Sequence, residues 1–596
     1  MIDRAASVPD TAADTFLAQI DRTFHDRADR VFAQLPSGPM TYAECRAEML
    51  RLVAVFARIG LAPGDRALIR SVDDGQVITF FLAMLRSGIV PVIADAQATD
   101  AECTQFCNLC DVRAVFADEA LATVAQVEMV TLGAGAATYG RSIRDLKNGA
   151  HVQEFPRLDH SPEVALLVLT SGTTSTPKAV ELTHANLVAQ LAIFEQVYGF
   201  GADTRLLNLL PLHHVDGLIR GPLATLWTGG TLVRPMPFSV QAVPEILATI
   251  GSARVTHFIS VPAMLRIIER VGAGRPDAFR VPGFAFVLSS ADVLDEALWR
   301  RFEDRFGVPL VNAYGLSEVV CDALFAGPEA ATRRIGTLGR PVGCTARVVD
   351  DAGREVPQGA TGELVLSGPT IARGYFGAPD ETAMVFKAGA FHTGDYVRVT
   401  AENLFQFVGR KKTAIVSAGQ TIHPEAATQA LSLMPGVLEA FAFGVPDAAM
   451  GERLVAAIVP APGYEITAAD AARHCRSLLS VERSPREYRI VQALPRGAAG
   501  KVLIADLLTI SSGPEPQAAS VLEVAASCFN VPVETLSPES TYFNTEGWDS
   551  LAHMTLIEAL EQAFGIQFTA IQIAQIMSLG EAETFVAEQR AALRAG

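Results

Sequence analysis

The feature that most constrains this chain is a run of small and hydroxyl-bearing residues that directly follows an apolar stretch. Residues 164–169 (VALLVL) form the kind of continuous apolar run that is typical of a buried strand. The next residues are Thr170, Ser171, Gly172, Thr173, Thr174, Ser175 and Thr176, and then Pro177 and Lys178. Such a loop offers backbone N–H groups, hydroxyl groups and one ammonium group to a polyanion. The pattern predicts a site for a nucleotide triphosphate, with a solvated Ser/Thr linker as the alternative. Its spacing does not match a P-loop.

Length, charge and cysteine usage narrow the class of protein. A chain of 596 residues predicts roughly two to four domains. The net charge of −17 argues against non-specific binding to nucleic acid. No apolar run approaches the roughly 18 residues that a membrane span requires, and residues 1–10 lack the pattern of a signal peptide. The eight cysteines are scattered, which suits a reducing compartment. We therefore expect a cytoplasmic protein without a membrane span or a nucleic-acid partner.

One group of cysteines raises the question of a metal site. Cys103, Cys107 and Cys110 are spaced four and three residues apart, which places them on one face of a helix. A structural zinc site normally needs a fourth ligand, and nothing nearby answers the CxxC pair. Because free cysteine is among the most buried residue types, we expect these three side chains on a buried helix face.

Residues 1 to about 160 alternate between helical and strand patterns. Residues 41–58 predict an amphipathic helix with Thr41 as its N-cap and Glu44 three residues later. Strands that alternate with helices indicate a parallel sheet covered on both faces. This segment shows no chemistry and is expected to be scaffold.

The hydroxyl-rich loop resembles the signature of the adenylate-forming enzymes, which are the acyl-CoA synthetases, the luciferases and the adenylation domains of peptide synthetases. That signature reads roughly TSGTTGxPKGV, and Ser175 and Ala179 replace two of its glycines here. The resemblance implies that the nucleotide is ATP and that its phosphates are bound by Thr170, Ser171, Gly172, Thr173, Thr174 and Lys178.

Two later segments match the same family in order. Residues 312–320, NAYGLSEVV, resemble the family pattern YGxTE. This implies that Tyr314 stacks on the adenine ring, Ser317 keeps a hydroxyl for phosphate, and Glu318 holds Mg²⁺, a cation that prefers carboxylate and phosphate oxygens.

In the second segment, FHTGDYVRV at 391–399, the resemblance assigns Asp395 to the two ribose hydroxyls, with Arg410 as the second ribose contact.

The segment PLHHVDGL, residues 211–218, bears on the substrate. In the family, the histidine that matches His214 lies beside the acyl-binding pocket and gates it, whereas His213 is expected to pack. Domains that activate α-amino acids carry an aspartate where this chain has Val215, and an ammonium group buried without a carboxylate would be costly. We therefore expect a plain carboxylic acid. Asp216 and Arg220 either read a polar group of the substrate or, as we expect, are ordinary solvated residues.

The family resemblance continues through a small C-terminal subdomain. Lys412 falls at the position about which this subdomain turns in the family. LPRGAAGKVLIADL, residues 494–507, places Lys501 where family enzymes bring a lysine to the substrate carboxylate and the α-phosphate. A cation there offsets the charge that builds up during attack.

The last 77 residues differ in character from the rest. Residues 509–519 are rich in Ser, Pro, Gly and Ala and predict a linker. From Glu515 onward the net charge is −9, about half of the chain's total. Helical patterns cover 521–529, 551–564, 570–576 and 581–594.

The centre of this segment, GWDSLAHM, resembles the acyl and peptidyl carrier proteins. The resemblance implies a 4′-phosphopantetheine arm on Ser550, attached by a phosphopantetheinyl transferase; the alternative is a simple helix cap. An acidic surface would suit recognition by basic patches on partner enzymes.

Together these patterns predict an α/β protein in four parts. A large, multi-sheet adenylate-forming domain (1–409) precedes a small, mobile α+β subdomain (410–508), a linker (509–519) and a helical-bundle carrier domain (520–596).

We expect ATP-dependent activation of a small carboxylic acid, transfer to the pantetheine thiol, and removal of the product by a downstream biosynthetic enzyme of a peptide-synthetase-like or polyketide-synthase-like pathway. The alternatives are transfer to free coenzyme A, or a carrier and docking protein whose adenylation half is inactive.

Overall fold

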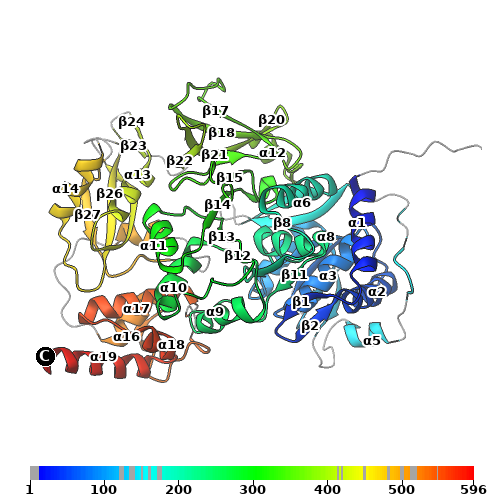
Figure 1. Ribbon diagram of the computed structural model, residues 1–596, viewed down its shortest axis with the longest axis horizontal. Coiled ribbons are helices and arrows are strands. Elements are labelled where there is room, and N and C mark those ends of the chain that lie inside the picture. The colour runs from blue at the N-terminus through cyan, green and yellow to red at the C-terminus, as the bar shows by residue number, and fades with distance from the viewer. Residues whose placement is uncertain are drawn as a thin grey trace, which may run out of the picture.

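The computed structural model describes most of the chain. The described residues are 12–119, 127–132, 141–148, 152–156, 158, 163–170, 177–411, 415–417, 420–447, 451–479, 484–496, 502–509, 520–529, 531–545, 548 and 550–595. Of the expected site residues, Ser171, Gly172, Thr173, Thr174, Lys412 and Lys501 lie outside them, and the side chain of Ser550 is not described. Figure 1 shows the arrangement of the elements.

A nine-stranded sheet forms one half of the large domain. Its order is β16-β15-β14-β13-β12-β10-β11-β1-β2. The strands are β1 (Val31–Leu35), β2 (Gly38–Thr41), β10 (Arg205–Asn208), β11 (Thr231–Val233), β12 (His257–Ser260), β13 (Phe286–Ser289), β14 (Leu310–Tyr314), β15 (Leu324–Ala326) and β16 (Arg340–Pro341). The six strands from β14 to β1 run parallel, so their carboxyl ends share one edge. Ligand sites of parallel α/β sheets are usually found at this edge.

An eight-stranded sheet forms the other half, in the order β19-β9-β8-β4-β3-β5-β6-β7. Its strands are β3 (Arg66–Arg70), β4 (Val90–Ile93), β5 (Val112–Ala117), β6 (Glu128–Thr131), β7 (Arg141–Ser142), β8 (Val164–Thr170), β9 (Lys178–Thr183) and β19 (Gly374–Tyr375). Strands β8, β4, β3, β5, β6 and β7 are parallel, as the sequence predicts. By contrast, β9 pairs antiparallel with β8 and β19 pairs antiparallel with β9.

Helices cover both sheets. They are α1 (Ala12–Asp26), α2 (Tyr42–Arg58), α3 (Asp74–Arg86), α4 (Asp100–Cys110), α5 (Ile143–Lys147), α6 (His184–Tyr198), α7 (Val215–Leu218), α8 (Ala224–Thr228), α9 (Val243–Ser252), α10 (Pro262–Val271) and α11 (Glu296–Phe306), with short turns η1 (Ile219–Leu223), η2 (Gly272–Gly274) and η3 (Ser317–Val319). The predicted capping box of α2 is present, since Thr41 and Glu44 bond each other's backbone N–H groups. No helix among the described residues has the length and apolar character of a membrane span.

The three clustered cysteines lie where a buried helix face was predicted. Cys103, Cys107 and Cys110 on α4 pack against the eight-stranded sheet and are buried. Burial raises the pKa of the Cys107 and Cys110 thiols to about 12. Thiols held in the neutral form are poor metal ligands, which agrees with a packing role.

Two smaller sheets follow. The first contains β17 (Thr345–Val349), β18 (Thr361–Ser367), β20 (Phe386–Lys387), β21 (Ala390–Val399) and β22 (Phe405–Arg410), with α12 (Pro379–Val385) beside it. The second contains β23 (Ile415–Ser417), β24 (Gln420–Ile422), β25 (Val437–Asp447), β26 (Gly451–Pro460) and β27 (Glu487–Ile490). Helices α13 (Pro424–Ser432), α14 (Ala468–Leu478) and α15 (Ile504–Thr509) accompany this last sheet, which has a core of its own.

The C-terminal segment is helical, and its helices begin and end within two residues of the predicted positions. They are α16 (Val521–Phe529), α17 (Ser550–Phe564), α18 (Ala570–Gln575) and α19 (Leu579–Ala595), with a turn η5 (Val533–Thr535). Figure 1 shows them, in orange and red, beneath α10 of the large domain. The predicted fold class is therefore confirmed in its mixed sheets and its helical C-terminal unit.

Candidate functional site

The hydroxyl-rich loop closes a hairpin at the edge of the eight-stranded sheet. Thr170 ends β8 and pairs with Lys178, the first residue of β9. The Thr170 hydroxyl lies 3.5 Å from the Lys178 carbonyl oxygen, to which it donates. Both ends of the loop are therefore fixed by sheet pairing, so Lys178 enters the site from a rigid strand.

Lys178 is joined to Glu318 by a residue that the sequence analysis missed. The short strand β19 pairs with β9 and places Tyr375 beside Lys178, whose ammonium nitrogen lies 4.5 Å from the centre of the tyrosine ring. The Tyr375 hydroxyl donates to Glu318 Oε1 at 2.8 Å. Burial, and then the Glu318 charge, raise the pKa of Tyr375, so it remains a donor. Tyr375 thus holds a cation and a carboxylate on either side of it.

A second cluster is built from Tyr314, Asp395 and Arg410, three of the predicted nucleotide-binding residues. The Tyr314 hydroxyl donates to Asp395 Oδ2 at 2.6 Å, and Arg410 Nε lies 3.1 Å from Asp395 Oδ1. Asp395 and Arg410 meet because β21 and β22 are antiparallel and these two residues lie directly opposite each other. The Asp395 side chain is 2% exposed, whereas that of Arg410 is 51% exposed.

Burial controls the protonation of this second cluster. It raises the pKa of Tyr314 well above its usual value, and the Asp395 charge adds to this effect. Burial also raises the pKa of Asp395, while the Arg410 guanidinium opposes the rise. A neutral phenol that donates to a buried carboxylate, with a cation at the rim, is a surface suited to the hydroxyls of a sugar.

The two clusters share one loop. Tyr314 ends β14 at the carboxyl edge of the nine-stranded sheet, and Ser317 and Glu318 follow in η3. The Glu318 carbonyl oxygen accepts from the Ala372 N–H at 2.8 Å, which ties η3 to the segment leading to Tyr375. Three sheets therefore meet around η3: β9 contributes Lys178, the end of β14 contributes Tyr314, and β21 and β22 contribute Asp395 and Arg410.

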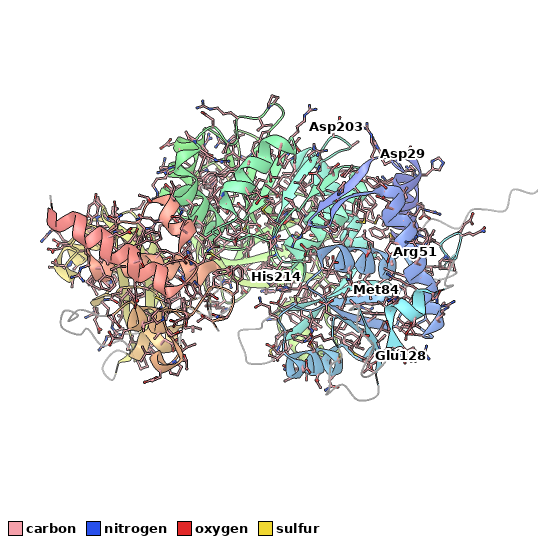
Figure 2. The ribbon with its side chains drawn as sticks, turned by 90° about the horizontal axis from the view of Figure 1, so that it is seen from below. Asp29, Arg51, Met84, Glu128, Asp203 and His214 are labelled. Atoms are coloured by element: carbon pink, nitrogen blue, oxygen red, sulfur yellow. The ribbon has the colours of Figure 1, made fainter. Side chains whose placement is uncertain are left out.

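His214 and Val215 lie at the start of α7. His214 is the exposed N-cap residue, Val215 is buried, and Figure 2 labels His214 near the middle of the molecule. The rings of His213 and His214 lie 4.1 Å apart, and His213 Nε2 is 3.7 Å from Asp95. Burial, and then the His214 charge, lower the pKa of His213 to about 4, so His213 is neutral and half-buried, as expected of a packing residue.

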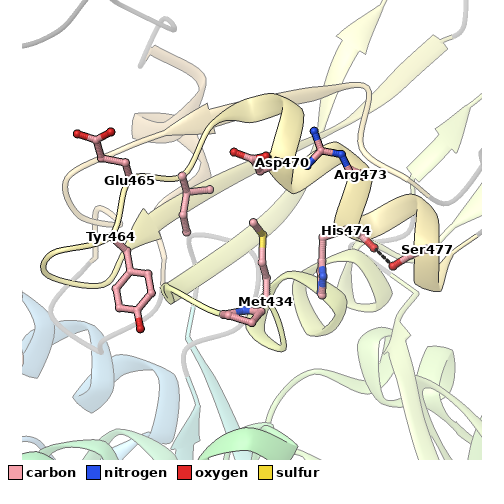
Figure 3. A pocket seen from close by; sticks show the side chains of 9 residues that line it. Met434, Tyr464, Glu465, Asp470, Arg473, His474 and Ser477 are labelled. Atoms are coloured by element: carbon pink, nitrogen blue, oxygen red, sulfur yellow. Dashed lines mark hydrogen bonds and ion pairs between the residues drawn. The ribbon is translucent and has the colours of Figure 1, made fainter.

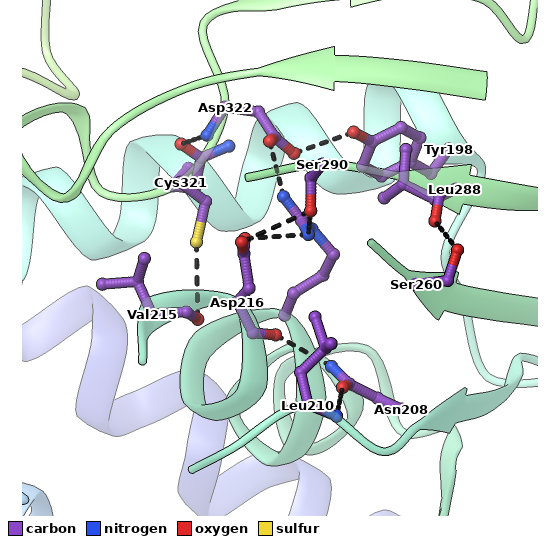
Figure 4. Close-up of polar contacts among 12 residues, drawn as sticks. Tyr198, Asn208, Leu210, Val215, Asp216, Ser260, Leu288, Ser290, Cys321 and Asp322 are labelled. Carbon is purple, nitrogen blue, oxygen red and sulfur yellow. Dashed lines mark hydrogen bonds and ion pairs between the residues drawn. The ribbon is translucent and has the colours of Figure 1, made fainter. Parts of the chain in front are cut away.

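The expectation that Asp216 and Arg220 are solvated is wrong. Arg220 is 0% exposed and forms ion pairs with Asp216 at 2.8 Å and with Asp322 at 2.5 Å. It also donates to the Ser290 hydroxyl at 3.0 Å, and the Tyr198 hydroxyl donates to Asp322 Oδ2 at 2.8 Å. Figure 4 shows Asp216, Ser290, Asp322 and Tyr198 converging at this point. The hydrophobic helix around Arg220 and its distance in sequence from Asp322 concealed the cluster.

The site residues suit the groups that the fold family implies. The described residues contain no cluster of three or more His, Cys, Asp or Glu side chains that would hold a metal by themselves. Mg²⁺ is commonly bound by one or two carboxylates together with substrate phosphates, so the single carboxylate of Glu318 near Lys178 fits it. The Asp395 cluster likewise fits a ribose.

A separate pocket of about 480 Å³ lies in the small subdomain, between the end of α13 and α14. Figure 3 shows its lining by Met434, Tyr464, Asp470, Arg473 and His474. None of the expected site residues lines it, so it does not form part of the candidate site.

Comparison with known proteins agrees with this geometry. Residues 20–376 match the family described as AMP-binding enzyme, and residues 429–501 match the AMP-binding enzyme C-terminal domain. The chain belongs to the AMP-binding enzyme family. Residues 519–586 match the phosphopantetheine attachment site, so the chain is an adenylate-forming enzyme fused to a carrier domain.

Several named proteins are similar to this family member. Sulfoacetate–CoA ligase of Cupriavidus necator is 38% identical over 339 residues, which are 57% of this chain and 65% of the relative, a little under two thirds of its length. Triostin synthetase I of Streptomyces triostinicus is 29% identical over 538 residues, 84% of this chain and 97% of that protein. The crystal structure of ATP-bound MatB from Rhodopseudomonas palustris superimposes with a TM-score of 0.74 at 26% identity, covering 82% of this chain and 98% of MatB.

Proposed function

We propose that this enzyme activates a small carboxylic acid as an acyl-adenylate and transfers the acyl group to the thiol of 4′-phosphopantetheine on its own Ser550. The observation that carries the proposal is the meeting of three sheets around η3, which brings Lys178, Glu318 and the Tyr314–Asp395–Arg410 cluster together in a chain that also contains a carrier domain. We propose the domain boundaries 1–409, 410–508, 509–519 and 520–596.

In this proposal the phosphates are bound by Lys178 and by the hairpin loop of Thr170, Ser171, Gly172, Thr173 and Thr174. Tyr314 lies against the adenine, Asp395 and Arg410 accept and donate bonds at the ribose hydroxyls, and the hydroxyl of Ser317 contacts phosphate. Mg²⁺ bound at Glu318 would offset phosphate charge. Catalysis is then positioning and charge stabilisation, without a covalent nucleophile on the protein.

The chemistry proceeds in two steps. A substrate carboxylate oxygen bonds to the α-phosphorus as pyrophosphate leaves, and Lys501 stabilises the charge that develops. The small subdomain then turns about Lys412, the pantetheine thiol bonds to the acyl carbon, and AMP leaves. His214 borders the acyl pocket and gates it. A phosphopantetheinyl transferase supplies the arm, and a downstream biosynthetic enzyme removes the acyl group.

The substrate is proposed to be a short acid and not an α-amino acid. Val215 is buried and apolar where an amino-acid-activating domain needs a carboxylate, and Asp216 is bound to Arg220. Sulfoacetate–CoA ligase and the oxalate–CoA ligase of Arabidopsis thaliana, 28% identical over 74% of this chain and 88% of that protein, are named for short acids with a second acidic group. These names support oxalate-like and sulfoacetate-like acids as the first candidates.

A second candidate is an acid–thiol ligase that uses free coenzyme A, because several relatives are named as CoA ligases. The two candidates differ in whether acyl transfer requires Ser550.

Intact mass spectrometry of the pantetheinylated protein tests the proposal. The protein is incubated with Mg²⁺-ATP and a panel containing sulfoacetate, oxalate, benzoate and an α-amino acid, beside Ser550→Ala as the matched variant. We expect one acid to add its acyl mass to the wild type and nothing to be added to the variant. Acyl-CoA formed equally by both proteins when coenzyme A is supplied in a parallel incubation, with no added mass on either protein, would support the second candidate.

A further inference from the structure

The carrier domain is joined in sequence to the small subdomain, yet it packs against the large domain. Helix α18 packs on α10 and η2. The buried side chains of the carrier and of the large domain belong to one continuous apolar cluster. Figure 1 shows the carrier helices alongside α10.

An ion pair crosses this contact. Arg270 Nη2, in the last turn of α10, is bonded to Glu561 Oε2 of α17. The side chain of Glu561 is 1% exposed and that of Arg270 is 24% exposed. Glu561 Oε1 accepts from the Phe568 N–H at 2.7 Å, so one oxygen faces the carrier's own loop and the other faces the large domain.

Because Glu561 is buried, Arg270 can distinguish a carrier that has a carboxylate at this position from one that does not. A carboxylate removed from water is costly unless a cation and hydrogen bonds compensate. Burial raises the pKa of Glu561, and the charge of Arg270 opposes the rise. A carrier with an uncharged residue at this position would pack against α10 without the charge-assisted bond.

We propose that the face formed by α10 and η2 is the docking surface on which the large domain holds its own carrier, and that Arg270 recognises the carrier through Glu561. The occupant is this chain's own carrier domain, whose residues 520–596 have a net charge of −8. The inference deepens the proposed function, on which it rests, because it names the surface that keeps the acyl acceptor beside the core.

The tether makes such a surface effective. The linker of eleven residues, 509–519, spans at most about 36–40 Å when fully extended. A short tether gives the carrier an effective concentration on the order of millimolar at the surface. A contact that would be weak between separate molecules is therefore occupied within the chain.

Hydrogen–deuterium exchange on the full-length pantetheinylated protein tests the docking surface. Arg270→Glu should speed exchange of the amides of α10 and α18 by about tenfold or more, since a hydrogen bond between charged groups is lost. Glu561→Gln, which keeps an acceptor for the Phe568 N–H, should have a smaller effect in the same direction. The combined charge reversal, Arg270→Glu with Glu561→Arg, should restore part of the protection.

Arg51→Glu is the matched control. Arg51 lies on α2, is 55% exposed, and is labelled in Figure 2 at the end of the molecule opposite the carrier. It makes the same change of net charge and should leave exchange at α10 and α18 unchanged. Adenylate formation, followed as ATP–pyrophosphate exchange, should be the same in Arg270→Glu and wild type, which excludes general unfolding.

Each result has a definite reading. Equal exchange in wild type, Arg270→Glu and Glu561→Gln would overturn the docking proposal, even if Ser550 is acylated normally. Protection that depends on Arg270 and Glu561 in a protein whose Ser550 is never acylated would support the docking surface and contradict the proposed function.

Discussion

Two clusters in this enzyme share three residue types but differ in their exposure to solvent. Each contains an arginine, an aspartate and a tyrosine whose hydroxyl donates to the aspartate. In the first, Arg220 and Asp322 are 0% and 1% exposed and Tyr198 completes the set. In the second, Arg410 is 51% exposed while Asp395 is 2% exposed and Tyr314 completes the set.

The difference shows how one set of side chains serves two ends. Arg220 is removed from solvent, and its guanidinium bonds to protein groups only: Asp216, Asp322 and Ser290. Such a network fixes the position of α7 and the strands around it. Arg410 lies at the rim, where its guanidinium reaches both Asp395 and solvent. The first cluster is suited to scaffold and the second to ligand binding.

The largest expected difference between the two clusters is in their contribution to the free energy of unfolding. Arg220→Ala leaves the buried carboxylate of Asp322 and the partly buried carboxylate of Asp216 without their cation. Removing one partner of a buried ion pair costs about 3–5 kcal/mol. We expect a loss of this size in the free energy of unfolding, measured by urea denaturation. Arg410→Ala is the comparison variant and should lose less stability, because Arg410 is half exposed and the Tyr314 hydroxyl still donates to Asp395. Equal losses in the two variants would contradict the contrast.

The carrier domain extends the comparison to a buried histidine, His553, whose pKa is lowered by burial. His553 is 0% exposed, accepts from Trp548 Nε1 at 3.1 Å and lies 3.1 Å from the Ile573 carbonyl oxygen. Since the indole can only donate, the imidazole is neutral, with Nδ1 as acceptor and Nε2–H as donor. Burial lowers the pKa of His553 to about 4, although the bond to Ile573 opposes the fall.

Because the folded-state pKa of His553 lies below its unfolded value of 6.5, protonation favours the unfolded carrier. The stabilisation is complete above pH 6.5 and is lost as the pH falls toward 4, by about 3 kcal/mol in all. Urea denaturation of wild type and His553→Gln at several pH values measures this. The wild type should lose stability relative to the variant as the pH falls, and a constant difference would show that His553 does not titrate in this range.

Steady-state kinetics tests whether the Tyr314–Asp395–Arg410 cluster binds ATP. Arg410→Ala removes a guanidinium at the proposed ribose contact, so we expect the KM for ATP to rise about tenfold, the loss of a single charge-assisted bond. The KM for the acid should stay the same, which initial-rate measurements of pyrophosphate release decide. An unchanged KM for ATP would place Arg410 outside the nucleotide site.

The smallest effect is expected at Tyr375. Tyr375→Phe keeps the ring beside Lys178 and removes the hydroxyl that donates to Glu318. A carboxylate freed from one donor is reoriented more easily, so the Mg²⁺ concentration for half-maximal rate should change about threefold, with little change in stability. A Mg²⁺ titration of the two proteins checks this, and identical curves would show that the hydroxyl does not position Glu318.

The sequence predicted elements whose signals are local. The capping box of α2 and the four carrier helices were placed to within two residues because caps, periodicity and turn residues lie inside each element. The Tyr314, Asp395 and Arg410 positions were identified through motifs, and the structure brings the three together.

What sequence reasoning missed depends on distant pairing. Tyr375 reaches Glu318 because β19 pairs with β9, almost 200 residues earlier in the chain. The residues around Tyr375 carry no sequence pattern that would predict this contact. Arg220 was misread because charged residues are usually solvated, whereas Asp322 arrives from a separate strand connection to neutralise it. The apolar residues on both sides of Arg220 were the available signal.

The position of the carrier has a mechanical consequence for the small subdomain. Its polypeptide leaves the large domain after β22 and returns, through the linker and the carrier, to α10. Both ends of the small subdomain are thus connected to the large domain, one directly and the other through the carrier. Such a subdomain can rotate about the line that joins its two connections, but the connections limit its movement away from the large domain. Cutting the chain within residues 509–519 would free this end of the subdomain, and the untethered carrier would occupy α10 less fully.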